Sequence, residues 1–445
     1  MKMTRRELLK ASTAFGALNI IPAKVLWGAT APSNQLTRAL IGFGCIAQSG
    51  NHLGFKGSRL IGVCDPFAAR VRHGLACAEK NGWGKIKAYR NFMELLADKD
   101  VDIAHICTPP HWHGCMSVMA AKAGKDIWCE KPMTRTVGEG RRVKEFLNSL
   151  PKKPMFRLNT WFRFQGNFYG FGTTVEPIRQ IVENGLLGEG PLKCTFGAGQ
   201  GFSWKFGWSG RINDRPQPVP KDFDYEMWLG PAPWKPYTDH RVGTSFRGYW
   251  DYDSGGLGDM AQHYLDPLQF LLCKDETSPV HVDYIGPKQH PESVGRFDRL
   301  TLTYADGTTV DLDGDETLKE EPLLRGSNGL CVYKKAPDGK TLRIKDDNGW
   351  WPEEKVLKTL AELPKPAAQQ TDFIDSCKTR KPFALNESNG FRSCTMFNLG
   401  IVAERLGRGF DFDPETLHAV DDEAAERYLY QEDRMREPWR KEMFG

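Results

Sequence analysis

Between residues 37 and 160, short apolar runs alternate with segments of helical spacing, and this alternation constrains the fold more than any other feature of the chain. The apolar runs cover residues 38–44, 59–65, 101–109, 126–132 and 155–160. The helical segments cover residues 67–80, 91–100, 115–124 and 140–150. Continuous apolar strands separated by helices form right-handed crossovers and a parallel sheet that is buried on both faces. The sequence therefore predicts a doubly wound parallel sheet.

The pattern changes after the last of these runs. Helical spacing occurs over residues 174–188 and 257–272, and residues 297–314 and 330–346 each alternate around an Asp-Gly turn. Hairpins that do not alternate with helices indicate an α+β arrangement with an antiparallel sheet. Residues 203–237 are rich in Trp, Pro and Gly, which fits either a loop that lines a ligand site or a packed structural excursion.

We therefore expect an α/β chain with two domains. Residues 34–157 are predicted to form a Rossmann-type domain with the doubly wound parallel sheet. Residues 158–445 are predicted to form an α+β domain with a large, mainly antiparallel sheet. The length of 445 residues, with 40% hydrophobic and 26% charged residues, suits two globular domains.

The first residues carry an export pattern rather than a part of the fold. Twin arginines in TRRELLK (4–10) precede an apolar stretch, and ATA (29–31) has the form of a cleavage site. Residues 1–31 are therefore predicted to be a twin-arginine signal that sends the chain to the periplasm or another extracytoplasmic space. A basic tail is the alternative. The apolar stretch of the signal is interrupted by Pro22 and Lys24 and is too short to span a membrane. No stable membrane insertion is expected after removal of the signal.

Charge and cysteine usage limit the function classes. The signal contains five Lys or Arg and one Glu, so the 60 bases and 56 acids of the chain become 55 of each after its removal. No basic run remains, and a nucleic-acid partner is not expected. The eleven cysteines are scattered and include no C-x-x-C pair. We expect buried free thiols, four of them near the ends of apolar runs (Cys45, Cys64, Cys107 and Cys129).

The first apolar run ends in IGFGCIA (41–47), a G-x-G-x-x-A pattern. Gly42 permits a tight turn, Gly44 lets the backbone approach a pyrophosphate, and Ala47 takes the place of the third glycine. The following helix start would supply amide donors to the phosphates. A tight strand-to-helix turn without a ligand is the alternative.

Asp65 ends the second run, 21 residues after Gly44, which is the spacing of an acid that binds the ribose hydroxyls of a dinucleotide. A carboxylate there would repel a 2′-phosphate, so NAD is favoured over NADP. A strand-end Asp that only caps a helix is the alternative.

TPPHWH (108–113) follows the next long strand and contains an H-x-H pair. Such a pair can bind zinc, but we find no partner ligands at matching strand ends and predict no metal. We expect His113 to pack on the side of the cofactor.

Two further clusters suggest catalysis. Glu130 and Lys131 stand where the 126–132 strand ends, at the sheet edge where doubly wound folds bind ligands. A surface ion pair is the alternative. In GGLGDMAQHYLD (255–266), helical spacing puts Asp259, His263 and Asp266 on one face. A core histidine beside a capping aspartate is the alternative there.

Together these motifs resemble the Gfo/Idh/MocA oxidoreductases, which include glucose–fructose oxidoreductase and inositol dehydrogenase. The resemblance spans nearly the whole chain after the signal and rests on GFGCIA, TPPHWH, EKP, NTWFRF (159–164) and GGLGDMAQHYLD. Residues 410–439 look like the tail of a bacterial branch that is often exported. Ala47 departs from the family's usual third glycine.

The resemblance implies roles for the quoted positions. Lys131, Asp259 and His263 would be catalytic, and Glu130 would lie near the nicotinamide ribose. Cofactor contacts are expected from Gly42, Gly44, Cys45, Ile46, Asp65, Thr108, Pro109, His113, Glu130, Lys131 and Asn159. Substrate contacts are expected from Lys131, Trp161, Arg163, Asp259 and His263. A homo-oligomer formed through the antiparallel sheet is also implied.

Hydride transfer from a sugar carbon to NAD requires the hydroxyl proton to leave, and a neutral His263 can accept it while the ammonium of Lys131 stabilises the developing charge on oxygen. We therefore expect an NAD(P)-dependent oxidoreductase that acts on a ring hydroxyl of a sugar or sugar derivative. Free cofactor is scarce outside the cytoplasm, so export favours tightly bound NAD that is regenerated in place. The alternatives are a redox-neutral NAD-dependent glycosidase and a non-catalytic sugar- or nucleotide-binding protein.

Overall fold

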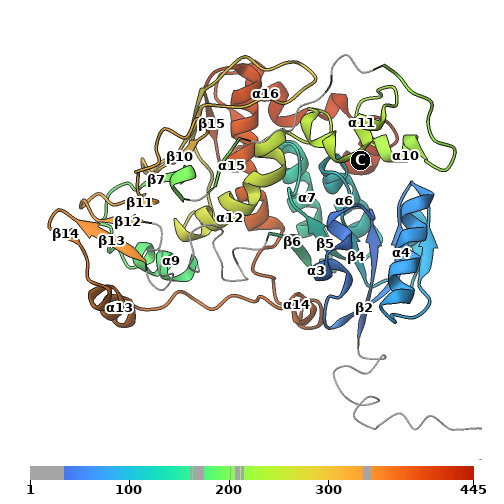
Figure 1. Cartoon of the computed structure of the whole chain (residues 1–445), viewed down its shortest axis with the longest axis horizontal. Coiled ribbons are helices and arrows are strands. Elements are labelled where there is room, and N and C mark those ends of the chain that lie inside the picture. The colour runs from blue at the N-terminus through green and yellow to red at the C-terminus, as the bar shows by residue number, and fades with distance from the viewer. Residues whose placement is uncertain are drawn as a thin grey trace, which may run out of the picture.

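The computed structural model describes residues 35–160, 163, 175–200, 202–205, 211, 215–333 and 342–445. The predicted export signal and Trp161, which is expected at the substrate, lie outside the described residues. Figure 1 shows a parallel sheet and a second, larger sheet side by side, with helices between them.

The N-terminal sheet has six parallel strands in the order β3-β2-β1-β4-β5-β6. The strands are β1 (Leu36–Ile41), β2 (Ser58–Cys64), β3 (Lys87–Tyr89), β4 (Ile103–Ile106), β5 (Asp126–Glu130) and β6 (Phe156–Asn159). This is the strand order of a Rossmann fold, which confirms the predicted doubly wound sheet. The pattern analysis missed β3 because it is a three-residue edge strand with two exposed positions.

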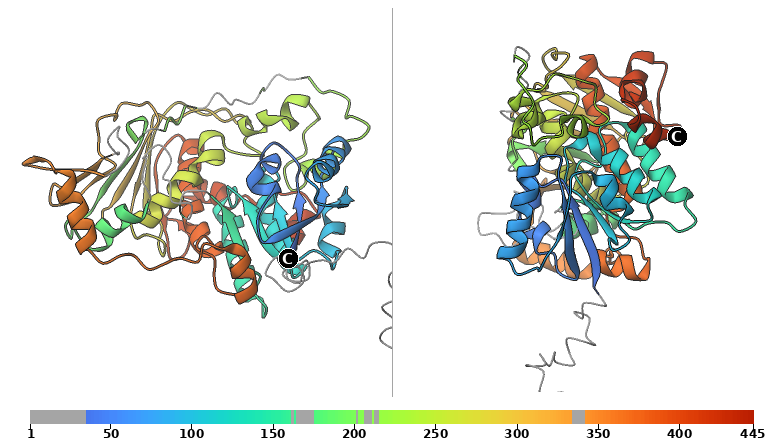
Figure 2. Two further views of the ribbon diagram at one scale, coloured as in Figure 1. Left: turned by 60° about the horizontal axis from the view of Figure 1, so that its bottom comes forward. Right: turned by 90° about the vertical axis from the view of Figure 1, so that its right-hand side faces the viewer.

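Helices cover both faces of this sheet (Figure 2). They are α3 (Gly50–Leu53), α4 (Ala68–Lys80), α5 (Phe92–Ala97), α6 (His113–Lys122) and α7 (Val137–Ser149). The central strands are therefore shielded on both sides, and Ala39, Ile103 and Ile127 are fully buried. This double burial explains why the strands appear in the sequence as continuous apolar runs.

The second sheet has ten strands in the order β14-β13-β12-β11-β7-β10-β9-β8-β15-β16. Their bounds are β7 (Lys193–Gly197), β8 (His281–Ile285), β9 (Arg299–Thr303), β10 (Thr309–Asp313), β11 (Leu324–Arg325), β12 (Cys331–Tyr333), β13 (Arg343–Asp346), β14 (Gly349–Trp350), β15 (Phe410–Asp413) and β16 (His418–Ala419). β7 and β10 pair in parallel, and the other recorded pairs are antiparallel. The predicted mainly antiparallel sheet and the β9–β10 hairpin are confirmed.

Helix α15 (Glu387–Leu406) lies at the centre of the molecule and contacts α7, β8 and α12 (Ala261–Leu271). Its side chains are buried along most of its length, so the two sheets share one continuous apolar core. The other helices are α9 (Val175–Glu183), α10 (Tyr225–Leu229), α11 (Asp239–Val242), α13 (Glu353–Glu362), α14 (Phe373–Thr379), α16 (Glu423–Tyr430) and α17 (Trp439–Phe444). α17 returns to the parallel sheet and packs on α6, close to the C-terminus marked in Figure 1.

Residues 215–252, here called the covering segment, leave the second domain and lie over the parallel sheet. They contain α10, α11 and the 3-10 helix η5 (Thr244–Gly248), and they have a small aromatic core of their own. Two backbone hydrogen bonds tie the segment to the turn after β2, from Ala68 N–H to Asp222 O and from Asp224 N–H to Pro66 O, both of 2.9 Å. Much of the Trp-rich stretch is therefore packed structure.

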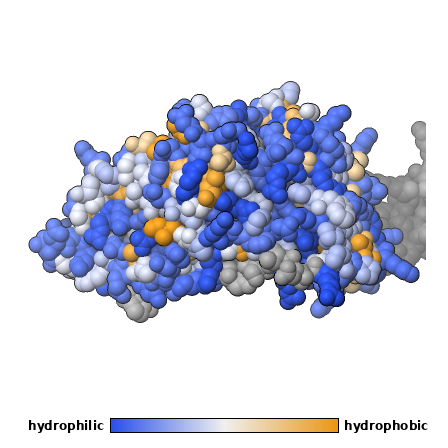
Figure 3. Space-filling view, turned by 90° about the horizontal axis from the view of Figure 1, so that it is seen from above, coloured by the Kyte–Doolittle hydropathy of each residue, from blue (hydrophilic) through white to orange (hydrophobic). Residues whose placement is uncertain are grey.

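The cysteines agree in part with the expectation of buried free thiols. All eleven cysteines are free and eight are buried, including Cys64, Cys107 and Cys129. Cys45, which was expected to be buried, is exposed. The face seen in Figure 3 is mostly hydrophilic, with small scattered hydrophobic areas. In the part of the chain described, no helix has the length and apolarity needed to cross a bilayer.

Candidate active site

A cavity of about 630 Å³ opens at the carboxyl ends of the parallel strands. It lies between the parallel sheet, the covering segment and the start of α12, as expected for the ligand-binding edge of a doubly wound fold. Eleven of the residues predicted for the site line this cavity: Gly42, Gly44, Cys45, Ile46, Asp65, Thr108, Pro109, Glu130, Lys131, Asp259 and His263.

The glycine turn after β1 leaves room for a ligand beside the backbone. Gly42 has a φ of +88°, and a Cβ there would lie 2.8 Å from the carbonyl oxygen of Cys107, so only glycine suits this turn. A Cβ on Gly44 would meet no protein atom within 4 Å. Ala47 is fully buried and packs in the 3-10 helix η2 (Ile46–Gln48) that follows the turn. The open space at Gly44 therefore faces the cavity rather than the core.

Asp65 braces this turn as well as lining the cavity. Its carboxylate accepts hydrogen bonds from the backbone N–H groups of Phe43, at 2.8 Å, and Phe67, at 2.9 Å. Burial raises the pKa of Asp65, although the nearby Arg70 opposes this shift. Arg70 and Arg90 also line this end of the cavity. The carboxylate of Asp65 and the guanidinium groups of Arg70 and Arg90 thus lie together, although the sequence indicated only Asp65.

The two histidines of TPPHWH point to different partners. His113 is fully buried, and its ring nitrogens lie 2.6 Å from the Pro132 carbonyl oxygen and 2.8 Å from the Thr108 carbonyl oxygen. It therefore joins the loops after β4 and β5 from behind the cavity wall. Burial lowers the pKa of His113 to about 4. His111 lies 3.0 Å from the Trp228 carbonyl oxygen and helps to anchor the covering segment.

Lys131, Asp259 and Arg247 form a chain of charges at the cavity wall. The Lys131 ammonium donates to the backbone oxygen of Asp259, at 2.6 Å, and lies 3.1 Å from its Oδ1. Arg247 Nε lies 3.1 Å from Oδ2 of the same carboxylate. Both carboxylate oxygens are thereby engaged by cations. Sequence reasoning missed Arg247, since an arginine in an aromatic loop gives no signal of its own.

These contacts set the protonation states of the acid and the histidine. Burial opposes ionisation of Asp259, but the cations of Lys131 and Arg247 outweigh it and lower its pKa. Burial, together with the charge of Lys131, holds the pKa of His263 well below its ordinary value. At neutral pH the cavity wall therefore presents an ionised Asp259 and a neutral His263.

The helix that carries these residues begins differently from the prediction. Residues Gly256–Met260 form a π-helical turn, η6, and the regular α12 starts only at Ala261. Asp259 in the π turn and His263 in α12 both line the cavity. Asp266, which was expected on the same face, is fully buried elsewhere. Single π turns are common at functional sites because they redirect side chains.

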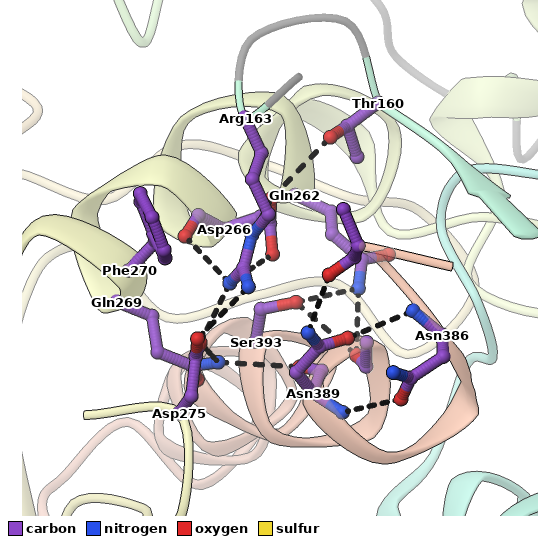
Figure 4. A network of polar contacts seen from close by, with 12 residues as sticks. Thr160, Arg163, Gln262, Asp266, Gln269, Phe270, Asp275, Asn386, Asn389 and Ser393 are labelled. Atoms are coloured by element: carbon purple, nitrogen blue, oxygen red, sulfur yellow. Dashed lines mark hydrogen bonds and ion pairs between the residues drawn. The ribbon is translucent and has the colours of Figure 1, made fainter. Parts of the chain in front are cut away.

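Arg163 is not brought to the cavity, where a substrate contact was expected. Its guanidinium lies 2.8 Å from Oδ1 of Asp266 and 2.6 Å from Oδ1 of Asp275 (Figure 4). The ring of Phe270 stacks beneath it at 4.9 Å. A buried arginine needs such carboxylate partners, so Arg163 pairs with Asp266 of α12 and does not line the cavity.

Glu130 lines the cavity, whereas Asn159, another predicted cofactor contact, stands behind it. The amide of Asn159 donates to Oε1 of Glu130 at 2.5 Å. Burial raises the pKa of Glu130 to about 7, although Lys131 and Asn159 lower it. Asn159 therefore supports a wall residue instead of reaching the ligand space.

Possible metal ligands come together at one place within the described ranges. His52, His105 and Cys107 have ligand atoms within 4.8 Å of one another. Burial lowers the pKa of both histidines, and the charges of Arg38 and Arg157, which flank this group, lower it further. Two buried cations oppose the binding of a metal ion, so we assign none.

Comparisons with known proteins agree with this geometry. Residues 36–156 match the family described as "Oxidoreductase family, NAD-binding Rossmann fold", GFO_IDH_MocA, and residues 171–441 match its "C-terminal alpha/beta domain", GFO_IDH_MocA_C2. D-glucoside 3-dehydrogenase of Escherichia coli is 27% identical over 161 residues, 35% of this chain and 42% of that protein. Myo-inositol 2-dehydrogenase of Thermotoga maritima is 32% identical over 112 residues, 25% of this chain and 30% of that protein. The chain thus spans well under half the length of these curated relatives.

Solved structures share the fold. The WlbA dehydrogenase of Bordetella pertussis, in complex with NADH and UDP-GlcNAcA, has a TM-score of 0.56 and 15% identity, with 85% of this chain and 99% of that chain covered. The aldose-aldose oxidoreductase of Caulobacter crescentus has a TM-score of 0.52 and 17% identity, with 85% and 100% covered. The family match extends over both domains and most of the chain, and this protein therefore belongs to the Gfo/Idh/MocA oxidoreductases.

Proposed function

We propose that this protein transfers hydride between a tightly held nicotinamide cofactor and a ring hydroxyl of a sugar or sugar derivative. One observation carries the proposal: a single cavity joins the open glycine turn to Lys131, Asp259 and His263. The names of the relatives, which include glucoside and inositol dehydrogenases, support a polyhydroxylated ring as substrate.

The residues of the cavity fit a dinucleotide. The space at Gly44, which no protein atom fills within 4 Å of a Cβ, suits a pyrophosphate against the backbone. Asp65 at one end and Glu130 at the other suit the two riboses. When bound, the nicotinamide ring would supply the hydride acceptor or donor.

The side chains at the inner end suit the proton chemistry. A neutral His263 accepts the hydroxyl proton of the substrate, because its low pKa keeps the ring unprotonated at neutral pH. The Lys131 ammonium has three N–H bonds, and Asp259 accepts from two of them, so the third is available to the substrate oxygen. Asp259 is a positioning residue for Lys131, and Arg247 holds Asp259 in turn.

NAD is proposed as the cofactor because Asp65 directly follows β2 and lines the cavity. Arg70 and Arg90 stand at the same end and would attract the 2′-phosphate of NADP. The ratio of the dissociation constants for NADH and NADPH decides between the two effects. A ratio that favours NADPH would overturn the assignment.

A second candidate is a redox-neutral glycosidase, and the covering segment favours it. The segment bonds to the nucleotide domain at residues 66–68 and so closes over one end of the cavity, which supports retention of the cofactor through a complete reaction cycle. Release of the aglycone from an aryl glycoside without net NADH would identify the glycosidase. Accumulation of a keto sugar would identify the dehydrogenase.

The proposal is tested by native mass spectrometry and turnover. The purified protein is expected to carry, or take up, one dinucleotide, and Lys131→Ala is expected to retain it while losing turnover on sugars, inositols and aryl glycosides. A protein that binds dinucleotide but turns over nothing in its wild-type form would instead support the non-catalytic alternative.

Export and oligomerisation are proposed on the sequence alone. We propose twin-arginine export on the basis of residues 1–31, tested by the cellular fraction that contains the protein after Arg5 and Arg6 are both changed to Lys. We propose a homo-oligomer through the ten-stranded sheet, tested by light scattering.

A further inference from the structure

A buried polar network lies directly beneath the wall of the cavity. It consists of Arg38, His52, His105, Glu130, Arg157 and Asn159, and each of these residues is at most 5% exposed. They come from β1, α3, β4, β5 and β6, so the network crosses the parallel sheet. Of the six, only Glu130 lines the cavity. The mechanism proposed above uses none of the others.

The contacts run in one direction along the network. Arg38 Nη1 lies 3.4 Å from Nδ1 of His105, His105 Nε2 lies 3.0 Å from Nδ1 of His52, and His52 Nε2 lies 3.1 Å from Oε1 of Glu130. A guanidinium can only donate hydrogen bonds. Nδ1 of His105 is therefore an acceptor, and the proton of this neutral ring is on Nε2, which faces Nδ1 of His52. Nδ1 of His52 is then an acceptor as well, so the proton of His52 is on Nε2, beside Glu130.

The surroundings hold both rings neutral and in place. The ring of Trp128 stacks on the ring of His105, with the ring centres 4.0 Å apart. The guanidinium of Arg157 also lies over the Trp128 ring, 4.0 Å from its centre. Burial and the two arginines lower the pKa of His52 to about 4. A neutral His52 with its proton on Nε2 places an N–H dipole beside Glu130 and does not compete with it for a proton.

We propose that His52 is a positioning residue that orients the carboxylate of Glu130 for the cofactor. Asn159 donates a hydrogen bond to Oε1, and Nε2 of His52 lies 3.1 Å from the same oxygen, which leaves Oε2 for a ribose hydroxyl near the reacting ring. This inference rests on the proposed function, because it assumes that Glu130 contacts a dinucleotide.

The network also affects the charge of Glu130. The groups that face this carboxylate are His52 from α3, Lys131 next in the chain, Asn159 and Arg157 from β6, and the buried thiol of Cys107 after β4. Loss of a donor to an ionised carboxylate raises its pKa. Removal of the His52 N–H, whose dipole lies beside the carboxylate, should likewise raise the pKa of Glu130 and shift the acidic limb of cofactor binding to higher pH.

Two substitutions separate the polar contacts of His52 from its bulk. His52→Leu removes both polar contacts, whereas His52→Gln keeps one donor for Glu130 and one acceptor for His105. The dissociation constant for NADH is measured by fluorescence between pH 5.5 and 9. We expect His52→Leu to weaken binding at least about tenfold and His52→Gln to stay within about threefold of wild type. Thr395→Val is the control, since Thr395 is fully buried in α15 and its hydroxyl donates to the Phe391 carbonyl oxygen of the same helix.

Nitrogen-15 NMR of labelled histidines gives an independent readout, the tautomer of His52. A neutral Nε2–H signal that disappears in both His52 variants is expected. A His52 signal of the Nδ1–H form, or a His52→Leu variant that is folded and binds NADH as the wild type does, would overturn the inference. If the wild type binds neither NADH nor NADPH, the proposed function fails, while the tautomer still decides whether the network is polarised toward Glu130.

Discussion

Replacing Arg247 by methionine removes one of the two cations that hold Asp259, and its effect can be estimated from the geometry. Nε lies 3.1 Å from Oδ2, where two unit charges interact by about 5 kcal/mol at an effective dielectric constant near 20. This is an upper value, because the Arg247 side chain is 18% exposed and regains part of its hydration. We expect a loss of about 1.5–3 kcal/mol in transition-state stabilisation, which lowers kcat/KM by about 10- to 100-fold.

The pH dependence supplies a second measurement on the same variant. In the wild type the two cations depress the pKa of Asp259, so the active ionised form is lost only as the pH falls through that depressed value. Without Arg247, only Lys131 opposes the effect of burial. The pKa of Asp259 rises, and the acidic limb of kcat/KM moves to higher pH.

Arg241→Met is the matched control for this experiment. Arg241 is a buried arginine of the same segment that stacks on the ring of Tyr249 at 4.6 Å and does not line the cavity. It should lower the melting temperature without moving the pH profile. An Arg247→Met variant with unchanged kcat/KM, or equal kinetic losses in both variants, would refute the role assigned to Arg247.

Three further predictions concern the turn, the covering segment and the core. Gly44→Val should weaken dinucleotide binding at least about tenfold in calorimetric titration while leaving the melting temperature almost unchanged, because the added atoms enter the cavity and not the core. Gly230→Ala should speed cofactor release in stopped-flow experiments, since a Cβ there would lie 2.0 Å from the Trp112 ring and disturb the anchor of the covering segment; an unchanged rate would count against retention by that segment. Arg163→Met should cost about 3–5 kcal/mol in the free energy of unfolding, measured by urea denaturation, because it leaves buried carboxylates unpaired. The folded fraction of that variant should keep its kcat, and a selective loss of substrate affinity would instead restore Arg163 to the substrate site.

The parallel sheet could be predicted because its information is local. A strand buried on both faces needs a continuous apolar run, and the crossover helices need their own spacing, so each element leaves a pattern in its own residues. The turn at Gly42 is local in the same sense, because its backbone conformation admits only glycine. Strand ends of a parallel sheet meet at one edge, and that rule was enough to predict that Asp65 and Lys131 lie at one cavity, whereas Thr108 was expected there from the family resemblance.

Other features depend on contacts between residues far apart in the chain, and only the tertiary structure decided them. Arg163 was expected at the substrate, but it pairs with Asp266 and Asp275, more than a hundred positions away. Arg247 and Asp259 are only twelve positions apart, but their contact also depends on how the covering segment folds back over the nucleotide domain, which no local pattern records.

The sequence by itself determined the two sheets and the glycine turn, since these follow from periodicity and from the conformational limits of single residues. Its motifs also indicated Asp259, Lys131 and His263 as the candidate acid, base and imidazole. The tertiary structure decided which charges neutralise one another. A buried ion pair or a chain such as that from His105 to Glu130 forms only when packing brings its members within about 3 Å, and the spacing of residues along a chain does not record that distance.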